Sequence, residues 1–197
     1  MPLLSSPRST SHPHAELAAQ QPSRSTGLQI AAKVIGGSLL VAIAAHVAVP
    51  FWPVPLTLQT LAVLGLGAAF GPVVGAAAVL AWITEGLAGL PVFAAGAGPA
   101  VLLGPTGGYI VGFLPAAALA GFAARRGWLG TPVRAALSFL AADAVLFAVG
   151  VAWLAVLVGW DRAIAGGFTP FLLGEALKVG LLTASAALLH GRRAPRA

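Results

Sequence analysis

Long apolar runs alternate with short segments rich in Gly and Pro along this chain. A hydrocarbon core of roughly 30 Å needs about 20 apolar helical residues at 1.5 Å each. Runs of suitable length predict six membrane-spanning helices. They are Leu28–Val49, Leu56–Leu90 divided in two at Gly71-Pro72, Gly108–Ala124, Val133–Val158 and Pro170–Leu189. The predicted fold class is therefore an all-α membrane protein, a bundle of six transmembrane helices.

One apolar segment fits this scheme less well. Residues Pro91–Gly108 are apolar but interrupted by prolines and several glycines, and the longest uninterrupted part is too short to span. Irregular backbone at membrane depth is tolerated where protein or a cavity surrounds it. We expect a folded loop that dips toward the membrane.

Composition supports the membrane assignment. Hydrophobic residues make up 58% of the 197 residues and charged residues only 8%, whereas about a quarter of the residues of a soluble domain are charged. The chain has no Cys, which excludes disulfides and thiolate metal sites. The four His residues are scattered, so we expect no metal site.

The basic residues fix the predicted orientation. With six spans and a cytoplasmic N-terminus, nine Lys and Arg residues lie inside, Arg162 lies outside and Lys178 lies within a span. This is a strong positive-inside signal, and a seventh span would destroy it. The net charge of +6 is thus explained by topology, and no nucleic-acid partner is expected. The inside set is Arg8, Arg24, Lys33, Arg125, Arg126, Arg134, Arg192, Arg193 and Arg196.

The ends of the chain differ in composition from its middle. Residues 1–27 are rich in Ser, Pro, His and Gln, which predicts a disordered cytoplasmic tail. Residues 28–190 form the expected six-helix substrate-binding domain, and residues 191–197 a basic cytoplasmic tail.

Once the tail, the loops and the helix ends are set aside, four ionisable residues remain inside the predicted spans: Glu85, Asp143, Glu175 and Lys178. A charge at the bilayer centre costs about 2.5–3.5 kcal/mol, so such residues tend to face a cavity or one another. Glu175 and Lys178 stand at i and i+3, on one helix face. They indicate a ligand site, the alternative being a pair that only neutralises itself. Asp143 either meets Lys178 across the bundle or is protonated, and Glu85 lies at the outer end of its span or at the interface.

Other polar residues gather near the same outer side. Pro50, Pro53 and Pro55 prevent a helix before the second span and force an extended loop. Trp52, Thr57, Gln59 and Thr60 accompany that loop, and Thr106 and Tyr109 lie among glycines before the fourth span. Two stiff loops and a charged helix face suit a cavity with apolar walls and a few polar groups.

No motif for energy transduction or catalysis is present. A phosphate-binding loop requires G-x-x-x-x-G-K-[ST], and neither lysine of the chain fits it. A nucleophile–base–acid set and an H-E-x-x-H motif are also missing. We therefore expect a protein that is not an enzyme and that needs no cofactor, with any ATPase on a separate chain.

The first predicted span is rich in small residues. Small side chains at four-residue spacing allow close helix packing, either with a partner subunit or within this chain's own bundle. We regard Ala32, Gly36, Ala44 and Ala48 as a candidate partner-docking face.

Three strings together closely resemble the BioY family, the biotin-binding S components of energy-coupling-factor (ECF) vitamin transporters. They are PFWPVPLTLQTLAVLG, GLAGLPVFAAGAGPAVLLGPTGGYIVGF and PFLLGEALKVGL. The resemblance runs from about Gly36 to Leu189. It implies a six-helix protein of the bacterial inner membrane that binds one biotin on its extracytoplasmic side. It also implies docking, through the small residues of the first helix, to a transmembrane T subunit with two cytoplasmic ATPases.

The resemblance also bears on individual residues. The last helix of the family usually reads G-D-x-x-K, with the acid and the lysine in the biotin pocket; here Glu175 replaces the aspartate and Lys178 is retained. Asp143 stands where relatives often have Asn, Ala152 replaces a proline, and Phe93–Gly98 lacks the amide of some relatives. We expect Glu175 to accept from a ureido N–H and Lys178 to donate to the carbonyl or the carboxylate. The full set of expected biotin-binding residues is Glu175, Lys178, Asp143, Tyr109, Gln59, Thr57, Trp52, Phe93 and Glu85.

Other functions stay open at the level of sequence. A stand-alone secondary carrier for biotin or a related molecule would use Asp143 or Glu85 as a proton site. The energising module would be dedicated or shared, and a homo-oligomer working alone is a further alternative.

Overall fold

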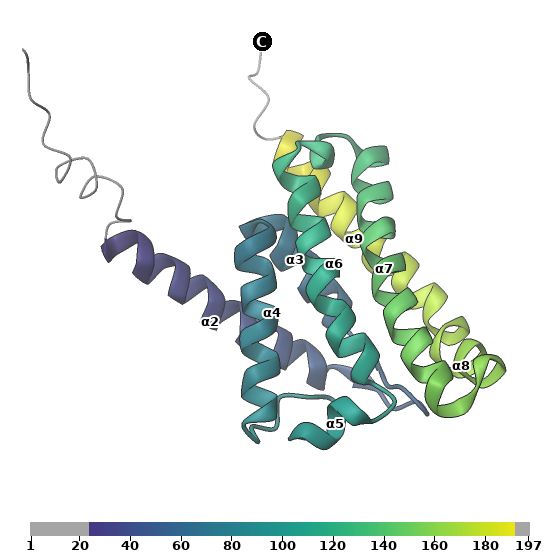
Figure 1. Cartoon of the computed structure of the whole chain (residues 1–197). Coiled ribbons are helices and arrows are strands. Elements are labelled where there is room, and N and C mark those ends of the chain that lie inside the picture. Colours follow the sequence, from purple (N-terminus) through teal and green to yellow (C-terminus); the bar gives the residue numbers. More distant parts are fainter. Residues whose placement is uncertain (1–23, 192–197) are drawn as a thin grey trace, which may run out of the picture.

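The computed structural model describes residues 24–191, and most of this range is helical (Figure 1). Residues 1–23 and 192–197, which hold most of the two predicted tails, lie outside the described part. The helices and strands are α2 (Arg24–His46), β1 (Ala48–Val49), β2 (Leu56–Thr57), α3 (Gln59–Phe70), α4 (Pro72–Leu87), α5 (Pro99–Leu103), α6 (Gly107–Arg125), η1 (Trp128–Gly130), α7 (Pro132–Val158), α8 (Trp160–Gly167), η2 (Thr169–Phe171) and α9 (Leu172–Gly191).

The six long helices correspond to the six predicted runs, with shifted ends. The first one begins at Arg24, so residues 24–27 are helical and were wrongly included in the tail. It ends at His46, and Ala48 and Val49 belong to a strand instead. The predicted break at Gly71-Pro72 is confirmed. Gly71 has φ +84°, a left-handed value that favours glycine, and Pro72 opens α4, where its missing N–H costs nothing.

Four helical segments are long and apolar enough to cross a membrane within the described range: Thr26–His46, Gly107–Arg125, Pro132–Val158 and Trp160–Leu189. Helices α3 and α4 are apolar but shorter, with 12 and 16 residues. Large apolar side chains such as Leu80, Val156 and Leu173 are exposed on the outside of the bundle. A surface of this kind suits lipid and not water, so the chain is a membrane protein.

Helices α3, α4 and α6 pack at backbone distance. A Cβ on Gly67 would stand 2.1 Å from the carbonyl oxygen of Ala117, and one on Gly75 would stand 2.7 Å from Cα of Gly67. A Cβ on Gly121 would stand 2.4 Å from the nitrogen of Pro72. Only glycine allows these approaches, so the upper part of the bundle in Figure 1 is a tightly packed block.

The proline-rich segment after α2 forms a small β-hairpin. Strands β1 and β2 pair antiparallel, Ala48 with Thr57 and Val49 with Leu56, and residues 50–55 connect them. The sequence predicted an extended loop here, which is confirmed, but it gave no sign of the strand pairing. Helix α3 begins directly after β2. The hairpin therefore positions Thr57 at the entrance to the bundle.

Residues 91–106 form the loop that the sequence predicted, with the short helix α5 inside it (Figure 1). The indole Nε1 of Trp82 donates to the carbonyl of Val92, and that of Trp153 donates to the carbonyl of Gly104. These two hydrogen bonds fasten the loop to α4 and α7.

Helix α2 is only partly packed in the bundle. Its first half projects away from the remaining helices (Figure 1).

Candidate functional site

A cavity opens between the β-hairpin, the 91–106 loop and helices α3, α4, α6, α7 and α9. The empty space between its walls is about 540 Å³, including the part open to solvent, but the interior that water can enter is narrow, about 50 Å³. The second figure lies well below the usual range of small-molecule sites, so the cavity is tight in this structure. The walls are lined by Val54, Pro55, Thr57, Gln59, Thr60, Trp82, Phe93, Ala94, Ala95, Val101, Thr106, Tyr109, Ile110, Phe113, Leu146, Phe147, Phe171 and Glu175.

Aromatic rings build most of the apolar wall. Phe93 packs edge-on against Trp82, with ring centroids 4.9 Å apart. On the opposite side Tyr109 stacks on Phe171 at 6.3 Å and meets Phe147 edge-on at 5.9 Å. The hydroxyl of Tyr109 donates to the carbonyl of Gly167 at 2.8 Å. Since that hydroxyl is committed to α8, the ring presents its apolar part to the cavity.

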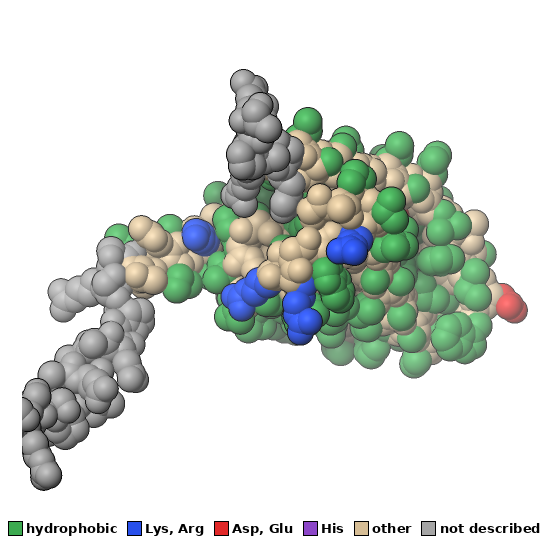
Figure 2. All heavy atoms as spheres, turned by 90° about the horizontal axis from the view of Figure 1, so that it is seen from above, with side chains coloured by type: hydrophobic (Ala, Val, Ile, Leu, Met, Phe, Trp, Pro, Cys, Tyr) green, Lys and Arg blue, Asp and Glu red, His purple; other side chains and the backbone are tan. Residues whose placement is uncertain are grey.

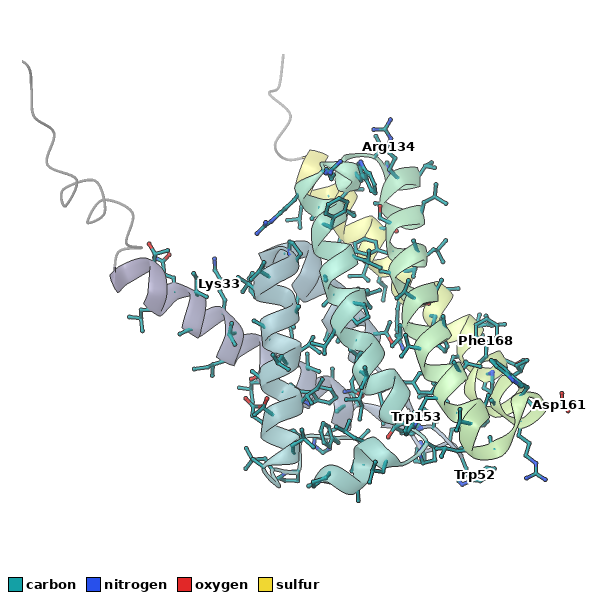
Figure 3. All side chains as sticks on the ribbon, in the orientation of Figure 1. Lys33, Trp52, Arg134, Trp153, Asp161 and Phe168 are labelled. Atoms are coloured by element: carbon teal, nitrogen blue, oxygen red, sulfur yellow. The ribbon has the colours of Figure 1, made fainter. Side chains whose placement is uncertain are left out.

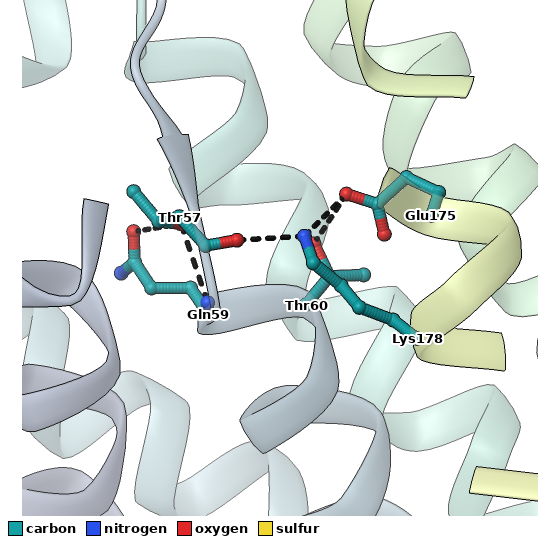
Figure 4. A network of polar contacts seen from close by, with 5 residues as sticks. All are labelled: Thr57, Gln59, Thr60, Glu175 and Lys178. Atoms are coloured by element: carbon teal, nitrogen blue, oxygen red, sulfur yellow. Dashed lines mark hydrogen bonds and ion pairs between the residues drawn. The ribbon is translucent and has the colours of Figure 1, made fainter. Parts of the chain in front are cut away.

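One side of the cavity is polar, and its centre is the charge pair of α9 (Figure 4). Nζ of Lys178 lies 2.7 Å from Oε1 of Glu175, the single ion pair within residues 24–191. The hydroxyl of Thr60 also donates to Oε1, at 3.3 Å. Glu175 is 6% exposed and Lys178 9%. Both side chains therefore point into the bundle, as predicted.

Lys178 also contacts the hairpin. Its Nζ donates to the main-chain carbonyl of Thr57 at 2.6 Å. The hydroxyl of Thr57 in turn accepts from the backbone N–H of Gln59 and donates to Oε1 of Gln59. These bonds join α9, β2 and the start of α3 into one network, shown in Figure 4.

Two atoms of this network have no partner in the described part of the chain. Oε2 of Glu175 and the amide Nε2 of Gln59 are buried and unbonded, and both residues line the cavity. A buried polar group without a hydrogen-bond partner costs about 1–3 kcal/mol. The presence of two such atoms on one wall therefore calls for an explanation. A free acceptor and a free donor on one cavity wall match a ligand that offers both an N–H and a carbonyl.

The structure brings together five of the nine predicted site residues on the cavity wall: Thr57, Gln59, Phe93, Tyr109 and Glu175. Lys178 lies just behind this wall. It reaches a second hollow on the other side of the hairpin, which Glu175 also lines. The lysine is thus hydrogen-bonded to the site without being exposed in the main cavity.

Three predicted residues lie off the cavity wall. The carboxylate of Glu85 accepts from Ser38 of α2 at 2.8 Å, so it joins two helices instead. Trp52 is 76% exposed, because it sits in the connection of the hairpin. Asp143 is buried on α7, one turn before Leu146 and Phe147 of the wall, and its Oδ1 is unpaired. It remains within electrostatic range of Glu175 and Lys178.

The sequence missed several wall residues. Trp82, Phe113, Phe147 and Phe171 carry no local mark that separates them from lipid-facing aromatics, because most residues around them in the sequence are apolar. Two glycines within predicted helices are the one sequence feature that could have indicated aromatic residues of the wall. A Cβ on Gly86 would stand 2.1 Å from the ring of Phe93, and one on Gly150 would stand 2.3 Å from the ring of Tyr109. Each of these glycines makes room for an aromatic side chain of the cavity.

The candidate docking face divides into two parts. Ala32 and Gly36 are exposed, and nothing lies within 4 Å of a Cβ built on Gly36. Ala44 is buried in the chain's own bundle, and Ala48 lies in β1. Ala44 therefore does not fit a partner-facing stripe, whereas Ala48 is exposed but lies outside α2.

Comparisons with known proteins agree with this architecture. The sequence profile of the BioY family matches residues 17–194. The "Probable biotin transporter BioY" of Pyrococcus horikoshii is 36% identical over 153 residues, which is 77% of this chain and 90% of that protein. The "Biotin transporter BioY" of Thermotoga maritima is 36% identical over 146 residues, 71% and 83% of the two chains.

A solved structure has the same fold. The S-component for biotin from an ECF-type ABC transporter superposes with a TM-score of 0.71 at 24% identity, and the match covers 89% of this chain and 96% of the other.

Proposed function

Because the chain belongs to the BioY family, we propose that it is a membrane-embedded biotin-binding protein, the S component of an ECF-type vitamin uptake transporter. Relatives in Pyrococcus horikoshii and Thermotoga maritima bear the name of biotin transporters. Biotin combines a ureido ring with two N–H donors and one carbonyl, an apolar bicycle and a carboxylate tail.

The unpaired atoms of Gln59 and Glu175 support this proposal most directly. Oε2 of Glu175 accepts from a ureido N–H, and Nε2 of Gln59 donates to the ureido carbonyl. Both buried groups then gain the hydrogen bond that they lack in the empty cavity. Hydrogen bonds to charged groups contribute about 1.5–3 kcal/mol, so the bond to Glu175 is the stronger one. The aromatic wall of Phe93, Trp82 and Tyr109 holds the apolar bicycle.

Lys178 has a different part in this proposal. Its ammonium already bonds Thr57 and Glu175, so it fixes the orientation of the Glu175 side chain and holds the hairpin in place. A carboxylate can accept hydrogen bonds on both oxygens, so Oε2 is left for the ligand while Oε1 bonds Lys178. Asp143 adds a second acidic group behind the cavity.

We further propose six membrane spans with both termini in the cytoplasm of a bacterial cell, in its inner membrane. Figure 3 shows Arg134 at the upper end of the bundle and Asp161 at the opposite end. Arg125 and Arg126 end α6 on the same upper side. An excess of basic residues at one end supports a cytoplasmic position for that end. The cavity then opens to the outside.

Transport requires energy from other chains in this scheme. The sequence has no phosphate-binding loop, and S components of this class work with a transmembrane T subunit and two ATPases. The exposed part of the small-residue stripe on α2, Ala32 and Gly36, is the proposed contact for the T subunit. Close helix packing in membranes uses such residues.

Two measurements test the function. Isothermal titration of the purified chain with biotin should give saturable binding of one biotin per chain, and the Glu175→Gln variant should bind more weakly. Biotin uptake by cells that lack their own transporter should require the T and ATPase subunits together with this chain. Uptake by this chain alone that collapses with an uncoupler would contradict the S-component assignment and favour a secondary carrier.

A further inference from the structure

Lys33 lies inside a candidate membrane span but has no acidic partner. It is the tenth residue of α2, within the span Thr26–His46, and it is exposed. The described acidic residues lie elsewhere, and in residues 24–191 only Lys178 forms an ion pair. The ammonium of Lys33 stands over the ring of Phe70, 5.6 Å from its centroid. That contact orients the charge but does not neutralise it.

Arg125 meets the same turn from another helix. Phe70 ends α3, Gly71 forms the turn and Pro72 begins α4. The guanidinium of Arg125 lies against Gly71, where an added Cβ would stand 3.0 Å from Nε. Arg125 is exposed and also has no acidic partner within the described range. Two cations without an acidic partner therefore flank the turn between α3 and α4. We call this turn, residues 70–72, together with Lys33 and Arg125 the basic step.

The α3–α4 turn of the basic step lies below the upper ends of the neighbouring helices α6 and α7. Figure 1 shows the α3–α4 turn lower than the upper ends of α6 and α7, and Figure 3 shows Lys33 well below Arg134. The lengths agree, since the 16 residues of α4 span about 24 Å. A hydrocarbon core of about 30 Å is longer than that. A short helix draws polar head groups inward or thins the bilayer around it.

We propose that the basic step binds an anionic phospholipid of the cytoplasmic leaflet, with the phosphate between Lys33 and Arg125. The placement on that leaflet rests on the proposed topology. Charge complementarity selects the occupant, because two exposed cations at head-group depth attract a phosphodiester. Figure 2, seen from above, shows Lys and Arg side chains gathered at this end of the molecule.

The surface beneath the basic step suits acyl chains. Leu40 is exposed two turns further along α2 from Lys33, on the same side of that helix. Val73 and Leu80 are exposed on α4, seven residues apart. Helices α2 and α4 pack against each other. The three side chains continue from the basic step toward the membrane centre, so head group and chains have adjoining contacts.

The test compares two double variants of equal charge. Lys33→Gln with Arg125→Gln removes the basic step, and Arg126→Gln with Arg134→Gln removes two cations from the same end of the bundle. Each full-length protein is taken from vesicles with equal parts of phosphatidylglycerol and phosphatidylcholine, and the retained lipids are counted by native mass spectrometry. Each basic residue near an anionic surface contributes roughly a factor of five, so the first variant should lose about twenty-five-fold in phosphatidylglycerol preference. The control should keep most of that preference.

The outcomes separate the inference from its alternatives. Equal loss in both variants, or no loss in either, overturns it, because the attraction would then be a general property of a basic surface. Unchanged lipid retention together with weaker association with the T subunit would also overturn it and assign the basic step to a protein contact. Swapping the two charges, Lys33→Arg with Arg125→Lys, should preserve the lipid. Biotin affinity should stay unchanged throughout, so a failure here leaves the proposed function standing.

Discussion

The ammonium of Lys178 donates a hydrogen bond of 2.6 Å to the main-chain carbonyl of Thr57, 121 residues earlier in the chain. This bond links the last helix to strand β2 of the hairpin, on the wall of the cavity. Any movement of the hairpin therefore changes the surroundings of the Lys178–Glu175 pair. The hairpin and the charge pair form one unit, and four variants test how that unit and the cavity wall work.

The first prediction concerns the lysine. Lys178→Met should abolish tight biotin binding and lower the thermal midpoint, since breaking a buried pair by removing one partner costs about 3–5 kcal/mol. It should also speed amide hydrogen exchange in residues 47–58, because the hairpin loses its bond to α9. Hydrogen exchange with mass spectrometry checks this. Unchanged exchange there would mean that the lysine does not hold the hairpin.

Glu175 should matter through its charge. Glu175→Gln keeps the size of the side chain but replaces the carboxylate, and we expect biotin to bind about 10–100-fold more weakly, as for the loss of a charged hydrogen bond. Titration calorimetry measures the change. The matched control is Glu85→Gln, a carboxylate that contacts Ser38 and not the cavity. Similar losses in both variants would remove Glu175 from the binding site.

Gln59 should recognise the ureido carbonyl. Replacing it by Leu removes the free Nε2 donor and should weaken biotin binding by about five- to tenfold, in line with roughly 1 kcal/mol for a neutral hydrogen bond. The sharper readout uses 2-iminobiotin, which lacks that carbonyl. The natural chain should prefer biotin to 2-iminobiotin more strongly than Gln59→Leu does. An identical preference in both would place the carbonyl elsewhere.

Gly86 should control the position of Phe93. A Cβ at this position would stand 2.1 Å from the ring, so Gly86→Ala must push Phe93 out of the cavity wall. We expect weaker biotin binding with little change in helix content. Gly36→Ala serves as the control, because nothing lies within 4 Å of the added Cβ and alanine favours the helix interior. Normal binding by Gly86→Ala would show that the wall tolerates a displaced ring.

The sequence predicted the helices of this fold better than it predicted which side of each helix faces the cavity. The six long helices, the break at Gly71-Pro72 and the inward pair Glu175–Lys178 follow from run length, glycine chemistry and the cost of burying charge. Spacing alone placed Thr57 and Gln59 near the same loop. The rotation of each helix was harder to predict, since helices such as α3 are apolar on every side beyond their first turn.

Two errors have the same physical origin. Glu85 was expected at the substrate, but Ser38 of α2 satisfies it, and no pattern within one helix reveals a partner on another. Ala44 was expected to face another subunit, yet it is buried at 7% exposure. Small residues suit internal and external packing equally, so only the tilt of α2 in three dimensions distinguishes them.

The glycine contacts among α3, α4 and α6 also limit how the molecule can move. Helices whose backbones touch at Gly67, Gly75 and Gly121 cannot slide or part without losing these close contacts around the α3–α4 turn. A carrier that rocks one half against the other would have to shear this block. Delivery of a vitamin to the opposite side is easier if the block travels as a single body, and the force for such a displacement must come from a neighbouring subunit.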